Sequence, residues 1–108
     1  MYAKVYNLKF PSVAEAKIAA SFCADCFGPL IVDFNMRSLN IALGACGSMT
    51  VQTKFDDSET LKKFEAKAQD TFEELKQSMA YKETHYSGVY IYHFEAEAAS
   101  AELGLNAS

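Results

Sequence analysis

The sequence has little of what marks several classes of protein. No apolar run among its 108 residues comes near the roughly 20 residues that span a bilayer. Ten basic residues against fourteen acidic ones give a net charge of −4, and the basic residues are scattered instead of forming the clusters that bind nucleic acid. We therefore expect neither a membrane nor a nucleic acid among the partners of this protein.

Cysteine is also scarce, and its count is odd: Cys23, Cys26 and Cys46. The N-terminus alternates like a strand and has no secretion signal, so we expect a cytoplasmic protein with free thiols. The Cys23–Cys26 pair has C-x-x-C spacing but lies well inside a predicted helix, away from the helix N-terminus that lowers a thiol pKa. A metal would need two more ligands, and Cys46 is the only other thiol. We interpret the pair as small buried thiols and predict no metal site.

What the sequence does have is an alternating stretch from Arg37 to Phe55 that predicts a β-hairpin. The turn between its strands, residues 44–47, supplies two glycines that accept positive φ angles. One face of the hairpin is mostly apolar and suits a cover of helices: Arg37, Leu39, Ile41, Leu43, Met49, Val51, Thr53 and Phe55. The opposite face is small and polar: Ser38, Asn40, Ala42, Thr50, Gln52 and Lys54.

The segments before the hairpin predict a strand and a long helix. Residues 2–10 alternate and end at a proline, and Ser12 with Glu15 three positions later is typical of a capping box at a helix start. Ile18, Phe22 and Cys26 form the apolar stripe of that helix. Gly28 and Pro29 interrupt it, and we expect residues 30–34 to add further helical turns ending near Asn35, with a strand over 30–34 as the alternative.

The segments after the hairpin predict a second helix and a last strand. Acidic and hydroxyl residues over 56–59 suit a helix N-terminus. The helix has a regular apolar stripe: Leu61, Phe64, Ala68, Phe72, Leu75 and Met79. After a connector over 82–85, residues 86–94 alternate as a strand, with Tyr90, Tyr92 and Phe94 on one face. Residues 95–108 form a C-terminal extension, in which a short helix over 95–103 precedes a frayed tail.

This order predicts an α+β fold of the ferredoxin-like βαββαβ type over a single domain, residues 1–108, with two helices on one face of a four-stranded antiparallel sheet. The other face is open in a monomer. We expect it to carry the polar side of the hairpin together with Lys4, Tyr6 and Leu8 of the first strand and the aromatic side of the last one. An exposed face with this many aromatic side chains is typical of an interface. A second copy of the chain is the simplest partner to bury it, which predicts a homodimer.

The element order, the long first helix that runs into a short hairpin, and the helix opening FDDSETLKKFEA resemble the dimeric α+β barrel proteins. These include the antibiotic-biosynthesis-monooxygenase-type and stress-responsive barrel domains, and the resemblance extends from Met1 to about Glu95. It implies two sheets packed face to face, with a cavity between them or between sheet and helices. Members include cofactor-free oxygenases, isomerases, haem-degrading enzymes and proteins with no known activity. The absence of tryptophan departs from the haem-degrading branch, and no catalytic set carries over.

Candidate site residues follow from the predicted open face. Tyr6, Tyr90 and Tyr92 could stack on a planar ligand, with Lys4, Asn40 and Gln52 as polar anchors. Tyrosine is also common in dimer interfaces, so these residues could instead form the interface of a homodimer. A ligand site and a dimer interface are compatible, because an interface can enclose a cavity. Of the two histidines, His85 is the better acid or base, because strand ends open onto pockets. A merely hydrogen-bonded or surface role is the alternative for His85 and for His93.

Two functions therefore stay open. The first is a small dimeric barrel that binds a small apolar or aromatic ligand between its sheets. The second is a cofactor-independent monooxygenase or isomerase of a small aromatic or polyketide-like substrate, in which His85 is the base and Tyr or Asn donors stabilise an enolate or phenolate. A regulatory ligand sensor is a third possibility, but the chain offers no output domain. None of the three requires a cofactor.

Overall fold

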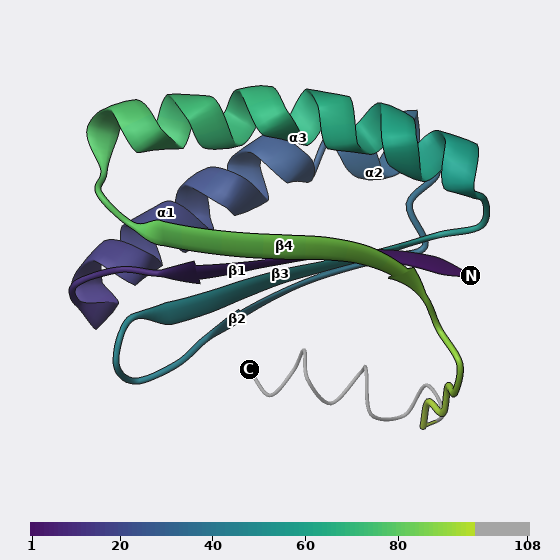
Figure 1. The fold of residues 1–108 in the computed structure, drawn as a ribbon, viewed down its shortest axis with the longest axis horizontal. Coiled ribbons are helices and arrows are strands. Elements are labelled where there is room, and N and C mark those ends of the chain that lie inside the picture. The colour runs from purple at the N-terminus through teal and green to yellow at the C-terminus, as the bar shows by residue number, and fades with distance from the viewer. Residues whose placement is uncertain (97–108) are drawn as a thin grey trace.

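The structure, a computed structural model, describes residues 1–96. Its elements follow the predicted βαββαβ order, with one extra helical turn: β1 (Tyr2–Lys9), α1 (Val13–Phe27), α2 (Leu30–Asp33), β2 (Ser38–Leu43), β3 (Ser48–Phe55), α3 (Ser58–Ser78) and β4 (Lys82–Val89). The sheet has the strand order β2-β3-β1-β4, with antiparallel neighbours throughout. All helices lie on one face of it (Figure 1), so the predicted ferredoxin-like arrangement is confirmed. The predicted tail and most of the predicted helix over 95–103 fall outside the described residues.

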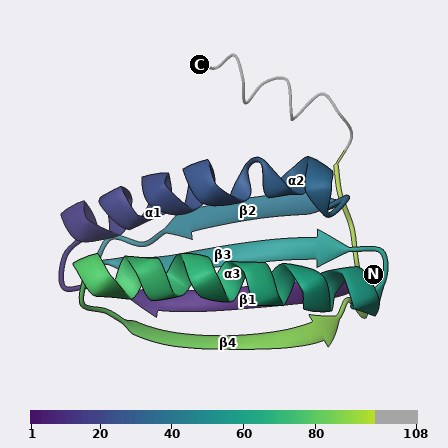
Figure 2. The same ribbon diagram turned by 90° about the horizontal axis from the view of Figure 1, so that it is seen from above.

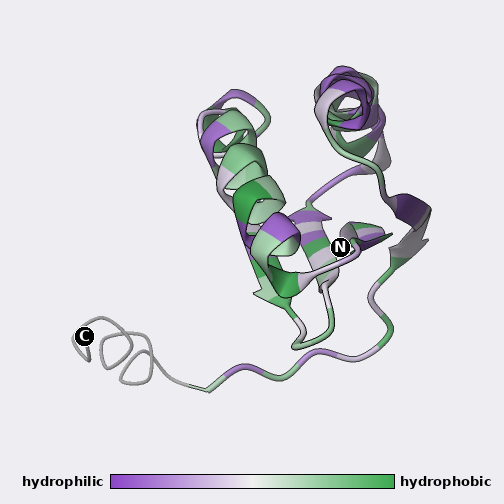
Figure 3. Ribbon diagram, turned by 90° about the vertical axis from the view of Figure 1, so that its left-hand side faces the viewer, coloured by the Kyte–Doolittle hydropathy of each residue, from purple (hydrophilic) through white to green (hydrophobic). Residues whose placement is uncertain are grey.

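The two long helices divide the sheet between them. Seen from above, α3 lies over β1, and α1 lies beside β2 (Figure 2). Hydrophobic residues prevail along α1, whereas the outer side of α3 is hydrophilic (Figure 3). The predicted stripe of α3 is confirmed, because Leu61, Phe64, Ala68, Phe72 and Leu75 are all buried. Asp57 caps this helix by accepting a hydrogen bond from the backbone N–H of Thr60 at 2.7 Å.

Aromatic rings of both helices meet over the sheet. The Phe64 ring centroid lies 5.2 Å from that of Phe55 on β3 and 5.5 Å from that of Phe27 at the end of α1. The Phe72 centroid lies 4.6 Å from that of Tyr6 on β1. Paired rings at these distances stabilise beyond the apolar area they bury. They fix α3 over the centre of the sheet, which positions the site described below.

The first helix buries a different stripe from the predicted one. Ser12 caps it as expected, accepting from the N–H of Glu15 at 3.2 Å. Its buried side chains, however, are Ala16, Ala19, Cys23 and Phe27. Of the predicted stripe, Phe22 and Cys26 are half-buried against the core, and Ile18 is 64% exposed. Small alanines at the sheet let the helix backbone approach closely, and a helix this rich in apolar residues offers more than one candidate stripe.

The turns after Pro29 are helical, as expected. Leu30–Asp33 forms α2, with Leu30 buried against the core. Asn35 then takes a φ of 50°, a left-handed conformation that asparagine tolerates and that ends the helix. The chain turns there directly into the hairpin.

The face assigned to β1 is wrong in the prediction. Tyr6 pairs with Val51 on one side and with His85 on the other, and residues directly paired across strands share a face. Lys4, Tyr6 and Leu8 therefore face the helices, where they are buried, and not the open side. Both faces of β1 carry apolar residues, so its alternation does not decide the orientation. Packing of Tyr6 on Phe72 decides it.

The last strand is also misplaced by prediction, which put it at residues 86–94. It runs from Lys82 to Val89, so the supposed connector over 82–85 forms its first half. The physical reason is the length of its partner. Val89 pairs with Tyr2 at the start of β1, and beyond it one more hydrogen bond, from the Tyr90 N–H to the Met1 carbonyl at 3.1 Å, is available. Tyr92 and Phe94 thus lie outside the sheet, 83% and 77% exposed.

Candidate functional site

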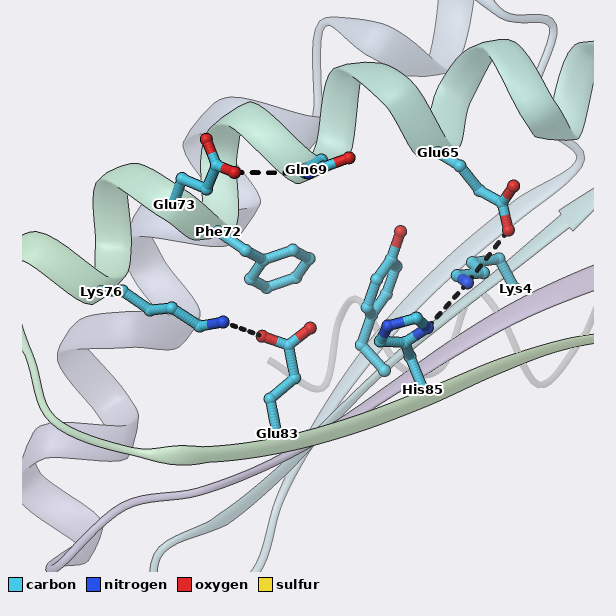
Figure 4. Close-up of a pocket in the computed structure, with 9 residues that line it drawn as sticks. Lys4, Glu65, Gln69, Phe72, Glu73, Lys76, Glu83 and His85 are labelled. Atoms are coloured by element: carbon cyan, nitrogen blue, oxygen red, sulfur yellow. Dashed lines mark hydrogen bonds and ion pairs between the residues drawn. The ribbon is translucent and has the colours of Figure 1, made fainter.

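A cleft of about 420 Å³ opens between α3 and the β1–β4 side of the sheet (Figure 4). It exists because the aromatic residues of α3 pack against β1, whereas β4 forms the edge of the sheet and lies to the side of the helix (Figure 2). The cleft is lined by Lys4, Tyr6, Glu65, Gln69, Phe72, Glu73, Lys76, Glu83 and His85. Charged groups of both signs therefore surround two aromatic rings, a composition typical of pockets that orient a small polar ligand.

A buried lysine forms one end of the cleft. The Lys4 side chain is 7% exposed, and its Nζ lies 3.0 Å from Glu65 Oε2 and 2.9 Å from His85 Nδ1. Glu65 Oε2 also accepts a hydrogen bond from the Ser87 hydroxyl at 2.6 Å. Figure 4 shows Lys4 between the carboxylate on α3 and the imidazole on β4. Lysine is rarely buried without such partners, so the three side chains form one unit.

The lysine also determines which nitrogen of His85 carries the ring proton. An ammonium group held by a carboxylate has hydrogens to donate and no lone pair with which to accept. His85 Nδ1 is therefore the acceptor of the Lys4 contact, and we assign the proton of the neutral ring to Nε2. In Figure 4 that second nitrogen points away from Lys4, toward the part of the cleft where Phe72 and Glu83 lie. It offers a hydrogen-bond donor to the cleft.

Glu65 is stabilised as a carboxylate. Its partial burial opposes ionisation, but hydrogen bonds from Ser87 and Lys4 and the positive charge of Lys4 outweigh this and lower its pKa. Tyr6 responds in the other direction. Burial, and then the negative charges of Glu65 and Glu83, raise the pKa of the Tyr6 phenol. Tyr6 therefore keeps its proton at neutral pH and remains a possible donor in the cleft.

Two carboxylates, Glu83 and Glu73, lie at the opposite end of the cleft from Lys4. The Glu83 side chain is 12% exposed, and its Oε1 lies 3.6 Å from Lys76 Nζ. On α3, Gln69 donates to Glu73 at 3.3 Å. Each end of the cleft thus holds an ion pair, Lys4–Glu65 at one end and Lys76–Glu83 at the other, and the rings of Tyr6 and Phe72 lie between them.

The predicted site residues fall into three separate places. Lys4, Tyr6 and His85 come together in the cleft, on the helix side of the sheet and not on the open side. Asn40 and Gln52 face each other across β2 and β3 on the open side. Tyr90 and Tyr92 line a different hollow of about 300 Å³ beyond the end of β4, where Lys54 Nζ lies 5.3 Å from the Tyr90 ring centroid.

The prediction missed the α3 side of the cleft together with Glu83. The charged residues of α3 alternate in sign like an ordinary solvated face, and Glu83 was assigned to a connector. Pairing of β4 with β1 in the structure places Glu83, His85 and Ser87 on the helix side, beside Lys4, and no local pattern in the sequence indicates this register. No group of three His, Cys, Asp or Glu residues suited to hold a metal occurs within residues 1–96.

None of the three free cysteines lines the cleft. Cys23 is buried, Cys26 partly buried and Cys46 exposed in the β2–β3 turn. Burial, and then the neighbouring Cys26 and Glu83, raise the pKa of Cys23 to about 12. Among the helices of residues 1–96, none is both long and apolar enough to cross a membrane.

No protein-family model matches the sequence, and no curated protein matches it. Solved structures do. A dimeric ferredoxin-like protein from an uncultured marine organism has a TM-score of 0.70 at 13% identity, covering 89% of this chain and 100% of the other. The chain has the ferredoxin-like fold. A candidate antibiotic biosynthesis monooxygenase from Deinococcus radiodurans has a TM-score of 0.67 at 12% identity, with the same coverage of both chains.

A third structure, Rv0793 from Mycobacterium tuberculosis, has a TM-score of 0.68 at 8% identity and covers 88% of this chain and 100% of its own. At these identities the likeness establishes the fold. The chemistry must therefore come from the side chains of the cleft.

Proposed function

We propose that the protein binds a small molecule in the cleft between α3 and the β1–β4 edge, and that this molecule has an aromatic body and a carbonyl or acidic oxygen. The observation that carries the proposal is the Lys4 ammonium, buried on the cleft wall and held by Glu65 and His85. Lys4 and His85 Nε2 supply donors for the oxygen. Tyr6 and Phe72, 4.6 Å apart between centroids, supply apolar surface for the ring.

We further propose that two copies associate through the open face of the sheet. In the described part of the chain no helix covers this face. A row of side chains, Asn40, Gln52, Val5 and Tyr86, crosses it on neighbouring strands, with Tyr86 58% exposed. The dimeric ferredoxin-like protein of similar fold supports this assembly. Multi-angle light scattering at micromolar concentration tests it: a mass of two chains is expected, and a stable monomer would contradict it.

An enzymatic role is the second candidate, and the Lys4–His85 pair favours it. Two adjacent donors on a cleft wall would stabilise the negative oxygen of an enolate or phenolate as it develops. This chemistry needs no cofactor, and it suits either a cofactor-independent monooxygenase or an isomerase. The name of the Deinococcus protein suggests a monooxygenase for that protein. His85 would then act as a hydrogen-bond donor and not as the base.

Two probes test the binding proposal: phenylpyruvate and 2-hydroxy-1,4-naphthoquinone, each a planar body with an acidic or carbonyl oxygen. Both should shift the backbone NMR signals of residues 65–76 and 83–87. Replacing Lys4→Met should weaken binding about 10-fold, since a hydrogen bond to a charged group contributes about 1.5–3 kcal/mol. The matched control is Lys54→Met, which removes a lysine outside the cleft.

Two outcomes would contradict the proposal. One is that neither probe binds at millimolar concentration. The other is that the shifted signals belong to the hollow at Lys54 and Tyr90, with Lys54→Met abolishing the binding that Lys4→Met leaves intact.

A further inference from the structure

One carboxylate oxygen in the cleft is buried without a hydrogen bond. Glu83 Oε1 accepts none from the residues that the structure describes. Lys76 Nζ, at 3.6 Å, is close enough for charge attraction but too far for a hydrogen bond. Buried polar atoms of this kind are uncommon in folded proteins, and each needs a physical explanation.

Two donors near Glu83 have acceptors other than Glu83 Oε1. The Tyr81 hydroxyl donates to the Phe72 carbonyl at 3.1 Å, and Gln69 donates to Glu73. Burial, then the negative charges of Glu83 and Cys23 and a hydrogen bond with Glu83, raise the pKa of Tyr81. The fold thus holds the Glu83 carboxylate on the cleft wall, with Oε1 turned to Lys76 and the other oxygen directed away from Lys76 (Figure 4).

Glu83 and His85 are spaced to act on one molecule. They are two residues apart on β4 and face the same side of the sheet, so their Cα atoms are separated by about 7 Å. Both line the cleft, with Phe72 above them on α3 (Figure 4). A ligand whose carbonyl oxygen accepts from His85 Nε2 and Lys4 would place the adjacent carbon toward Glu83.

We propose that Glu83 is a general base that removes a proton from the carbon next to a ligand carbonyl, so that the site catalyses a keto–enol tautomerisation. The proposal rests on the binding function proposed above and names its substrate class: small aromatic compounds with an acidic C–H beside a carbonyl. In the step, the C–H bond breaks and an O–H bond forms on Glu83. The electron pair of the C–H bond becomes the C=C bond of an enolate, whose oxygen His85 and Lys4 stabilise.

Protonation of the enolate oxygen completes the enol, and loss of the Glu83 proton to solvent restores the carboxylate. Reversal of the step with a solvent deuteron on Glu83 places deuterium on the carbon. No electrons leave the substrate, so the cycle consumes no oxidant, reductant or second substrate.

The proposal is tested by the rate of deuterium exchange at the benzylic carbon of phenylpyruvate in D₂O, which is monitored by proton NMR. The wild-type protein should accelerate exchange above the rate in buffer. Glu83→Gln, which keeps the size of the side chain, should slow the accelerated exchange about 100-fold or more, the usual contribution of a general base. Its Kd for phenylpyruvate should stay within about 3-fold of wild type, because the amide does not alter the Lys4–His85 end.

Glu74→Gln is the matched control, since Glu74 is an exposed carboxylate on α3 that does not line the cleft; its exchange rate should stay within about 2-fold of wild type. In Glu83→Asp the carboxylate is one methylene farther from the ligand. This variant should still bind phenylpyruvate, with an exchange rate between those of wild type and Glu83→Gln, and it provides the test if the Gln variant fails to fold. Full exchange in a Glu83→Gln protein that binds the probe would overturn the role of Glu83. Binding without acceleration by the wild type would also overturn it, with the binding function intact. Absence of binding by the wild type would overturn both.

Discussion

Replacing Lys4→Met tests whether the buried ammonium stabilises the protein as well as its cleft. Methionine keeps most of the apolar stem of lysine, so the packing of β1 changes little. What is lost is the ammonium group, with its contacts to Glu65 at 3.0 Å and to His85 at 2.9 Å. After the change Glu65 retains the Ser87 hydroxyl, and His85 Nδ1 loses its partner.

The magnitude follows from the exposure of these partners. A hydrogen bond to a charged group contributes about 1.5–3 kcal/mol net, and losing one member of a fully buried pair costs about 3–5 kcal/mol. The Glu65 side chain is 30% exposed and can be rehydrated, and removing Lys4 also removes the cost of burying its charge. We therefore expect the free energy of unfolding to fall by about 1–2 kcal/mol.

Urea unfolding followed by far-UV circular dichroism measures this loss, and a decrease of about 1 M in the midpoint is expected for a domain of this size. Lys67→Met, which changes an exposed lysine on α3, is the control and should alter stability by less than about 0.5 kcal/mol. A double-mutant cycle with Glu65→Gln should give a coupling energy of about 1 kcal/mol between Lys4 and Glu65. A Lys4→Met protein as stable as the control, with no coupling, would refute this account of the buried lysine.

Three further outcomes are expected. Phe64→Ala removes a fully buried ring and should cost about 3–5 kcal/mol by urea unfolding, whereas Phe64→Leu should cost clearly less; equal losses would contradict the role of the ring. Because folding lowers the pKa of Glu65, its ionised form stabilises the protein above the ordinary glutamate pKa of about 4.3, and this contribution is lost as pH falls below that value. The difference in the free energy of unfolding between wild type and Glu65→Gln, measured by urea unfolding, should therefore become smaller at acid pH. A difference that grows at acid pH would contradict this expectation. Thiol labelling should modify Cys46, exposed and with its pKa lowered by Ser48 and Lys9, well before Cys23; the reverse order in native protein would be inconsistent with the burial of Cys23.

Much of the fold could be predicted from the sequence, because the patterns that indicate helices, strands and caps are local. The Ser12 cap, the hairpin alternation and the stripe of α3 each depend on residues a few positions apart. Such patterns predicted the element order and placed the helices on the Val51 side of the hairpin. Asn40 and Gln52 accordingly lie on the open face, as expected. The predicted stripe of α1 was wrong because an alanine-rich helix can bury more than one side.

The site depended on pairing between distant strands, which only the tertiary structure decided. The alternation of β1 offers two faces that are both apolar enough to bury, and packing of Tyr6 on Phe72 chose between them. The end of β4 is set by where β1 begins, at Tyr2, and not by the aromatic run that follows. These two facts bring Lys4, His85 and Glu83 to one cleft. The sequence by itself thus determined which elements form, whereas their register, a product of long-range hydrogen bonding and core packing, decided which side chains meet.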